Sequence, residues 1–144
     1  MDWYGHPKIL TLKLTNLPDG YPSDFNFPKG CDPNIAGYYD RGWCFCESSV
    51  SNISTDNVEV LDLGKLSGTK TKLSHIVKEC EAQRRPPLSP QQFKLELATK
   101  SFTSKRTDEE MVSNLYAGAL TAQFREVKDL MYSQLSWGDE ELAL

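Results

Sequence analysis

The sequence has no long apolar run and no excess of positive charge. A membrane-spanning helix needs about 20 consecutive apolar residues, and no stretch of the 144 residues approaches that length. Lys and Arg number 16 against 20 Asp and Glu, so the net charge is −4 and the chain lacks the cationic field that holds a nucleic-acid backbone. The opening residues, MDWYGHPKIL, have neither the charged start nor the apolar stretch of a signal peptide. We therefore expect a cytoplasmic protein that binds neither membranes nor nucleic acids.

Histidine and cysteine are also scarce. The chain has two histidines and four cysteines, Cys31, Cys44, Cys46 and Cys80. Cys44 and Cys46 form a C-x-C pair rather than the C-x-x-C of a zinc knuckle. One interpretation is a zinc site built from the four thiols, and the other is that Cys46 and Cys80 pack as small hydrophobes on helix faces. We expect the second, with free thiols, no metal and no bound cofactor.

The remaining composition is that of a folded domain. Apolar residues make up 39% of the chain and charged residues 25%, which excludes a disordered polyelectrolyte. The length lies in the common range of single domains, about 100–150 residues. A chain of this size buries about 70% of the surface that its unfolded form exposes, so we expect a hydrophobic core that needs no disulfide or metal.

Two stretches have the pattern of β-strands. In residues 8–15, Leu10, Leu12 and Leu14 alternate with polar residues, which predicts a strand that buries its leucine face. Residues 58–63, VEVLDL, predict a second strand. Both are short, as expected for a small sheet.

A long loop and several helices fill the rest of the chain. Residues 18–40 are rich in Pro, Gly and aromatic residues, and a loop of this length in a small domain is usually functional or covers a surface. Apolar spacing and caps predict helices over residues 41–54 and 72–84, from residue 90, and over residues 108–125. Residues 99–104 could add a short strand.

The order of strands and helices predicts an α/β fold. Alternating strands and helices are typical of parallel sheets with helices on their faces. Two or three strands are few for such a sheet, which normally has more strands and is covered on both sides. We therefore expect a partial three-layer sheet, completed by a partner or by a longer chain, with a helical C-terminal part.

Residues 41–47, RGWCFCE, contain the pattern W-C-x-x-E at the start of a predicted helix. This stretch resembles the motif that opens the third helix of TIR domains, and it is similar to the R-G-W-x-x-x-E core of TIR-like proteins of protists and algae. The resemblance covers residues 8–64. It implies a flavodoxin-like parallel sheet in which residues 8–15 are the third strand and residues 58–63 the fourth.

The resemblance also implies a site. In NAD-cleaving TIR domains the motif's Glu is the catalytic carboxylate, which here is Glu47, and Trp43 would pack or stack beside the substrate. A fixed carboxylate suits the reaction, because cleaving the nicotinamide–ribose bond passes through an oxocarbenium-like cation. NAD(P) would then be a substrate and not a cofactor. The other interpretation makes Trp43 a core anchor and Glu47 a half-exposed residue or a partner of Arg41.

Both ends of the sequence suggest a longer protein. A TIR domain has two strand–helix units before the motif's strand, whereas only seven residues precede residue 8 here. The last ten residues, LSWGDEELAL, resemble the opening of a leucine-rich repeat of the ribonuclease-inhibitor type. We expect a TIR-like partial α/β unit over residues 1–64, a helical part over 65–134 and the start of a repeat over 135–144.

Three functions follow. The favoured one is a non-catalytic protein-interaction module of TIR-like descent, which binds a protein partner or a second copy of itself, with Arg41 as a candidate binding residue. The second is an NAD(P) glycohydrolase that uses Glu47. The third is an adaptor, because Arg84, Pro87 and Pro90 match the R-x-x-P-x-x-P form of SH3 ligands, in which a preformed polyproline II segment and an arginine are recognised.

Overall fold

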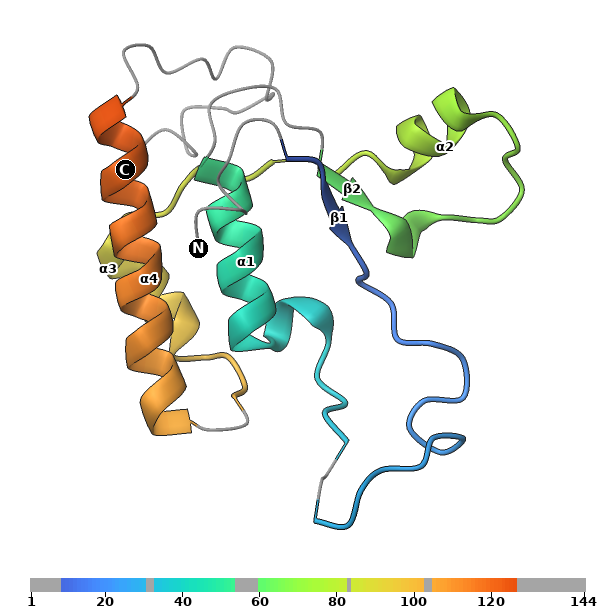
Figure 1. The fold of residues 1–144 in the computed structure, drawn as a ribbon, viewed down its shortest axis with the longest axis horizontal. Coiled ribbons are helices and arrows are strands. Elements are labelled where there is room, and N and C mark those ends of the chain that lie inside the picture. The colour runs from blue at the N-terminus through green and yellow to red at the C-terminus, as the bar shows by residue number, and fades with distance from the viewer. Residues whose placement is uncertain (1–8, 31–32, 54–59, 83, 103–104, 127–144) are drawn as a thin grey trace.

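The computed structural model describes residues 9–30, 33–53, 60–82, 84–102 and 105–126. Within these residues the fold is α/β, with a two-stranded parallel sheet and four α-helices (Figure 1). In chain order the elements are β1 (Thr11–Lys13), a 3-10 turn (Tyr38–Asp40), α1 (Gly42–Ile53), β2 (Val60–Asp62), a second 3-10 turn (Leu63–Lys65), α2 (Leu73–Cys80), α3 (Pro90–Leu97) and α4 (Lys105–Glu126). The predicted α/β class is confirmed at this level.

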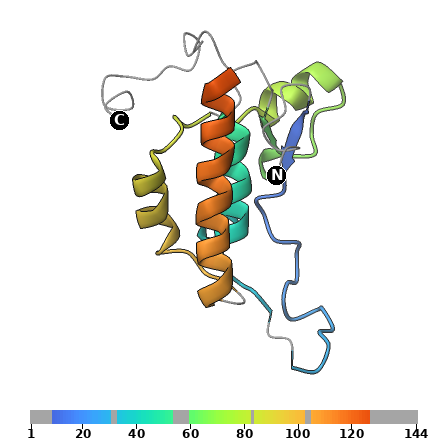
Figure 2. The ribbon, with the colours of Figure 1, turned by 60° about the vertical axis from the view of Figure 1, so that its left-hand side comes forward.

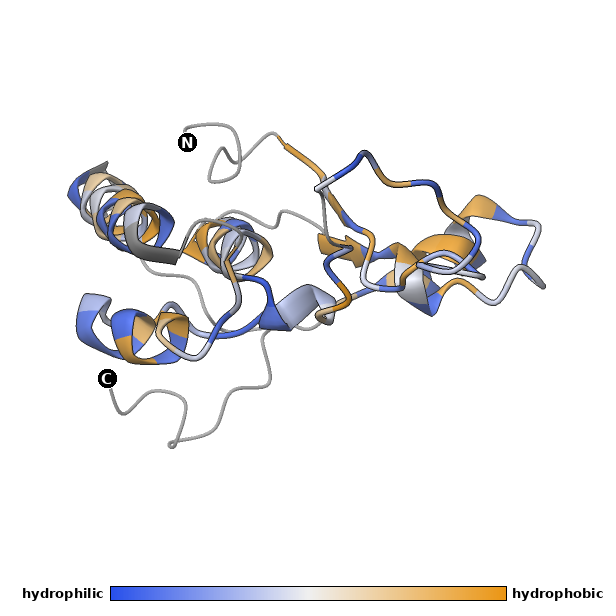
Figure 3. Ribbon diagram, turned by 90° about the horizontal axis from the view of Figure 1, so that it is seen from below, coloured by the Kyte–Doolittle hydropathy of each residue, from blue (hydrophilic) through white to orange (hydrophobic). Residues whose placement is uncertain are grey.

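The elements form layers around α1. Figure 2 shows α4 running alongside α1, with α3 on one side of this pair and the sheet and α2 on the other. Seen from below, α3 and α4 have both hydrophilic and hydrophobic faces, the pattern of helices with one buried side (Figure 3). The sheet thus lies between α1 and α2.

β1 and β2 pair in parallel, with Leu12 opposite Leu61 and Lys13 opposite Asp62. The helix α1 connects the two strands, as the predicted β-α-β order requires. The predicted strand over residues 99–104 is wrong for the residues described there, because Ser101 forms only an isolated bridge with Arg41.

The leucine face of β1 is the exposed face, and here the sequence prediction is wrong. Leu10, Leu12 and Leu14 are 52%, 53% and 71% exposed, whereas Lys13 is only 4% exposed. The physical reason is the polar surface that α1 turns toward the sheet, where the Ser48 hydroxyl accepts a hydrogen bond from the Lys13 ammonium at 2.7 Å. The strand therefore buries its polar side.

The other face of the sheet is covered on β2 but open on β1. Helix α2 packs on β2, and both Leu61 and Cys80 are buried there. The helix ends at Cys80, earlier than predicted, because the chain then becomes extended and Ala82 donates a hydrogen bond to the Val60 carbonyl. Residues 81–82 thereby also cover the outer edge of β2.

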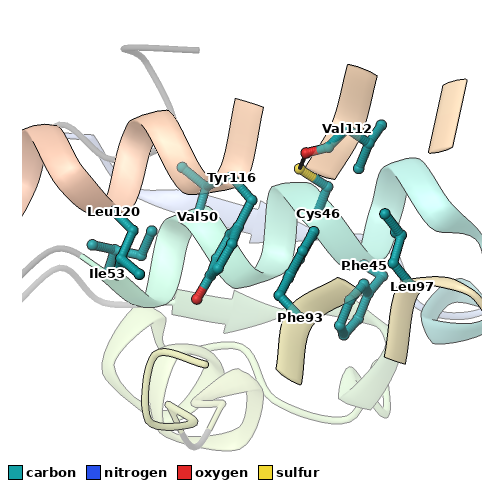
Figure 4. Packing of buried hydrophobic residues seen from close by; sticks show 9 residues of the cluster. All are labelled: Phe45, Cys46, Val50, Ile53, Phe93, Leu97, Val112, Tyr116 and Leu120. Atoms are coloured by element: carbon teal, nitrogen blue, oxygen red, sulfur yellow. Dashed lines mark hydrogen bonds between the residues drawn. The ribbon is translucent and has the colours of Figure 1, made fainter. Parts of the chain in front are cut away.

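The hydrophobic core lies between α1, α3 and α4 (Figure 4). The ring of Phe93 stacks between Phe45, at 5.0 Å between centroids, and Tyr116, at 3.8 Å. The Tyr116 hydroxyl donates a hydrogen bond to the Leu88 carbonyl at 2.7 Å, so its polar atom is satisfied at the margin of the core. The buried set is Phe45, Cys46, Val50, Ile53, Phe93, Leu97, Val112, Tyr116 and Leu120.

Most of the predicted helix faces are confirmed. The apolar stripe of α1 is buried, and so are Phe93 and Leu97 of α3. Helix α3 begins with the predicted capping box, in which Ser89 and Gln92 each accept a hydrogen bond from the other's backbone N–H. Met111, predicted to face inward, is exposed because Val112 holds the buried position beside it. The predicted repeat start, residues 135–144, lies outside the described residues.

Candidate functional site

A pocket of about 290 Å³ opens between β1, α1, α3 and the segment over residues 85–88. Its lining combines charged and hydroxyl or amide side chains with aromatic rings, prolines and a leucine. The lining residues are Lys13, Tyr39, Phe45, Ser48, Ser49, Asn52, Arg85, Pro86, Pro87, Leu88, Glu96 and Tyr116. The Tyr38–Asp40 turn, β1, residues 85–88 and the helices α1, α3 and α4 therefore contribute to one cavity.

Lys13 and Ser48 form the polar centre of this pocket. The Lys13 side chain leaves the inner face of β1 and its ammonium donates to the Ser48 hydroxyl at 2.7 Å. Burial lowers the pKa of Lys13 to about 8; the nearby Asp62 carboxylate opposes this shift, and the charge of Arg85 adds to it. Lys13 is therefore mostly protonated at neutral pH.

Both cations of the pocket, Lys13 and Arg85, lie near the ring of Tyr39. The Lys13 ammonium lies 5.8 Å from the centre of the Tyr39 ring, and the Arg85 guanidinium lies 6.0 Å from it. Both distances are within or close to the range of cation–π attraction. Burial, followed by the charge of Asp62, raises the pKa of the Tyr39 phenol, so it stays protonated as a hydrogen-bond donor.

A buried lysine beside a serine hydroxyl can in principle activate the serine as a nucleophile. Two features of this pair favour binding over covalent chemistry. The lysine is a donor in its protonated form, and Ser48 lies in the middle of α1, where backbone N–H groups are engaged within the helix and cannot form an oxyanion hole. The pocket is thus better suited to hold an anion.

The fixed positions of the W-C-x-x-E motif, Trp43, Cys44 and Glu47, do not line this pocket, although Phe45 between them does. The Trp43 indole N–H donates to the Asp108 carboxylate on α4 at 3.3 Å, and its ring packs against the core. Glu47 is half-buried on α1. Burial, with a smaller effect of the Glu47 charge, raises the pKa of Cys46 to about 12, so this thiol remains protonated. Trp43 therefore joins α1 to α4, as in the core-anchor interpretation.

Arg41 holds the long loop against the start of α1. Its guanidinium donates to the carbonyl of Ala36 at 2.9 Å and to that of Asn34 at 3.0 Å. These bonds fix the end of the aromatic-rich loop, whose Tyr21 ring contacts Phe25 edge-on at 5.5 Å. The contacts of Arg41 are thus internal to the chain.

The R-x-x-P-x-x-P segment is also engaged within the fold. Arg84 is buried and donates from Nη2 to the Asn52 carbonyl at 2.6 Å, near the C-terminal end of α1. Pro87 is buried, and Pro90 is the first residue of α3. An SH3 ligand has to be exposed and extended, so this geometry does not favour the adaptor interpretation.

Sequence reasoning did not find the pocket residues Lys13, Tyr39, Ser48 and Arg85. A signal was present in α1, where serines at 48, 49 and 51 share one helix with the apolar stripe. Such a helix has a second, polar side, whose hydroxyl groups need hydrogen-bond partners where they are buried. The lysine within the leucine strand was the matching signal on β1.

Comparisons with models of protein families, with curated proteins and with solved structures found no match to this chain. No helix within the described ranges is long and apolar enough to cross a membrane. In that same part of the chain, no three His, Cys, Asp or Glu side chains are grouped as metal ligands. The pocket and the leucine face are therefore interpreted from their own geometry.

The lowered pKa of Lys13 predicts a pH dependence of stability. Between about pH 8 and 10.5 the unfolded chain binds this proton and the folded chain releases it, so the free energy of unfolding rises with pH in this window. In the wild-type chain we expect this rise in unfolding free energy to be on the order of 2 kcal/mol, and we expect it to be absent in Lys13→Met. The other charged or titratable groups that act on Lys13, which are Asp62, Arg85 and Tyr39, are the same in wild type and variant. Urea unfolding at pH 7, 8.5 and 10 measures the difference, with the exposed Lys94→Met as control; parallel curves for wild type and Lys13→Met would contradict it.

Proposed function

We propose that this chain is a non-catalytic protein-interaction module of TIR-like descent, part of a longer protein, which associates through the leucine face of β1. This face consists of Leu12 in β1 and of Leu10 and Leu14, which flank the strand, and all three are more than half exposed. The observation that carries the proposal is this exposure on a strand whose opposite side is buried. Parallel sheets normally have both faces covered, so three exposed leucines favour a partner.

The open edge of β1 supports the same proposal. β1 pairs with β2 on one side, and no residue in the described ranges pairs with its other edge. An unpaired edge presents N–H and C=O groups that can accept a further strand. In a flavodoxin-like sheet of order 2-1-3-4-5 the third strand has neighbours on both sides, and β1 has the place of that strand in the TIR resemblance. A partner strand added there would extend the sheet and bring apolar side chains over the leucines.

A variant of the leucine face tests the proposal. We expect the wild-type chain to form dimers at about 100 μM, a weak association that corresponds to about 5 kcal/mol, and Leu12→Ser/Leu14→Ser to remain monomeric. Sedimentation velocity over a concentration series measures this. The matched control is Leu95→Ser, because Leu95 is 67% exposed but lies on α3. A wild-type chain that stays monomeric up to about 1 mM, or equal association in the double variant, would contradict self-association through this face.

The NAD(P) glycohydrolase is the weaker proposal. Neither Glu47 nor Trp43 lines the 290 Å³ pocket, and the Trp43 indole is bonded to Asp108 of α4. A stacking role for Trp43 would have to break that contact. The support for an NAD(P) glycohydrolase is therefore the resemblance of the W-C-x-x-E motif alone. The pocket described above does not include the two residues that this reaction would use.

A further inference from the structure

The pocket beside β1 contains a cation with unused hydrogen-bonding capacity. A lysine ammonium has three N–H donors, and Lys13 directs one of them to Ser48 at 2.7 Å. Within the described part of the chain it has no other hydrogen-bond acceptor. The side chain is nevertheless only 4% exposed. A buried ammonium with two open donors favours a ligand that supplies acceptors.

A second cation lies near the same aromatic ring as Lys13. The Arg85 guanidinium and the Lys13 ammonium approach the same Tyr39 ring, at 6.0 Å and 5.8 Å from its centre. The positive charge of Arg85 disfavours the charged form of Lys13 and contributes to its lowered pKa. An anion bound between Lys13 and Arg85 would offset the repulsion between their charges.

The acidic side chains nearby do not neutralise this pair of cations directly. Asp62 is buried opposite Lys13, but its Oδ1 atom accepts hydrogen bonds from the Thr15 hydroxyl and the Gly64 N–H. Glu96 lines the pocket from α3. Within the ranges that the structure describes, neither carboxylate forms an ion pair with Lys13 or Arg85. Among the residues that the structure places, Lys13 and Arg85 therefore have no carboxylate in direct contact.

We propose that this pocket binds a small hydroxylated organic anion. Its carboxylate or phosphate group lies between Lys13 and Arg85, and its hydroxyl groups meet Ser48, Ser49 and Asn52. The size agrees, since about 290 Å³ is at the lower end of ligand pockets, which span about 300–1,000 Å³. The site faces α1, on the opposite side of β1 from the leucine face, and does not depend on the association proposed above.

Calorimetric titration at pH 8 and low salt tests this proposal. The probes are glycerol 3-phosphate and glycerate, with glycerol as the uncharged control. We expect saturable binding of at least one anion and no binding of glycerol; which anion binds more tightly separates a phosphate site from a carboxylate site. Lys13→Met is expected to weaken binding at least tenfold, and Lys94→Met, an exposed lysine on α3, to leave it unchanged. Arg85→Met is a second variant, at an exposed residue, should Lys13→Met not fold.

Proton uptake gives an independent readout. An anion beside Lys13 raises the pKa of the ammonium, so binding at pH 8 takes up at most about half a proton per ligand. The uptake is measured as the difference in binding heat between buffers of different ionisation enthalpy, and it is expected to vanish in Lys13→Met. Absence of saturable binding of either anion up to about 50 mM, or unchanged affinity in the Lys13 and Arg85 variants, would overturn the proposal. Normal binding by Leu12→Ser/Leu14→Ser would show that the pocket acts apart from the leucine face.

Discussion

The Phe93→Ala variant is expected to lose about 3–5 kcal/mol of unfolding free energy. Phe93 is fully buried and its ring is stacked on both sides, against Phe45 and Tyr116. Removing the ring leaves a cavity between three helices, because those two partners belong to α1 and α4. Since small domains have about 5–15 kcal/mol of stability, a large part of it would be lost. Urea unfolding followed by far-UV circular dichroism measures the change.

A neighbouring position on the same helix provides the control. Leu95 is 67% exposed on α3, so Leu95→Ala changes a side chain of similar helix propensity without opening a cavity. We expect this variant to lie within about 0.5 kcal/mol of wild type. Equal effects of Phe93→Ala and Leu95→Ala would contradict the three-helix core.

The second large effect is expected for Arg84→Met, a loss of about 2–3 kcal/mol. The Arg84 guanidinium donates to the Asn52 carbonyl at 2.6 Å. That carbonyl lies in the last turn of α1, where C=O groups have no partner within the helix and where a positive charge is favourable. Without the arginine this buried carbonyl loses its donor. The measurement is the midpoint and slope of urea unfolding at pH 7.

Two further variants sharpen this prediction. Arg84→Lys keeps the charge but not the planar group of donors, so we expect it to lose less unfolding free energy than Arg84→Met. Arg125→Met, at an exposed residue of α4, is the control and is expected to change the unfolding free energy little. A protein-ligand role for Arg84 predicts the opposite outcome, in which Arg84→Met folds with unchanged stability and loses a binding partner. The two interpretations of this residue are therefore separated by a stability measurement alone.

The sequence was sufficient for α1, α3, α4 and the order of the two strands, but not for the end of α2 or for the buried face of β1. Apolar spacing correctly identified α1, α3 and α4 because their buried stripes, such as Cys46, Val50 and Ile53, face a purely hydrophobic core. The capping box of α3 was readable because Ser89, Pro90 and Gln92 act within one turn. Local interactions of this kind are contained in the sequence itself.

The burial of β1 could not be read in the same way. Alternation predicts two faces of a strand, and the more apolar face is ordinarily taken as the inner one. Lys13 is buried because of Ser48, a residue 35 positions away on another element. A pairing between distant polar residues leaves no periodic trace in either segment. The pocket was missed for the same reason, since its residues come from β1, the first 3-10 turn, α1, the segment after Arg84, α3 and α4.

Helix α1 separates two environments of opposite character. On one side, close packing of hydrocarbon surfaces holds α3 and α4, and such surfaces accept substitutions that keep their volume. On the other side, individual hydrogen bonds from Lys13 and Arg84 hold the strand and the segment after β2, and each of these bonds needs a donor and an acceptor at a set distance and angle. We therefore expect the two sides of one helix to diverge at different rates in descendants of this chain. The apolar side can drift among residues of similar size, whereas Lys13 and Ser48 are expected to change together and Arg84, whose acceptor is a backbone carbonyl, to be replaced only by another donor.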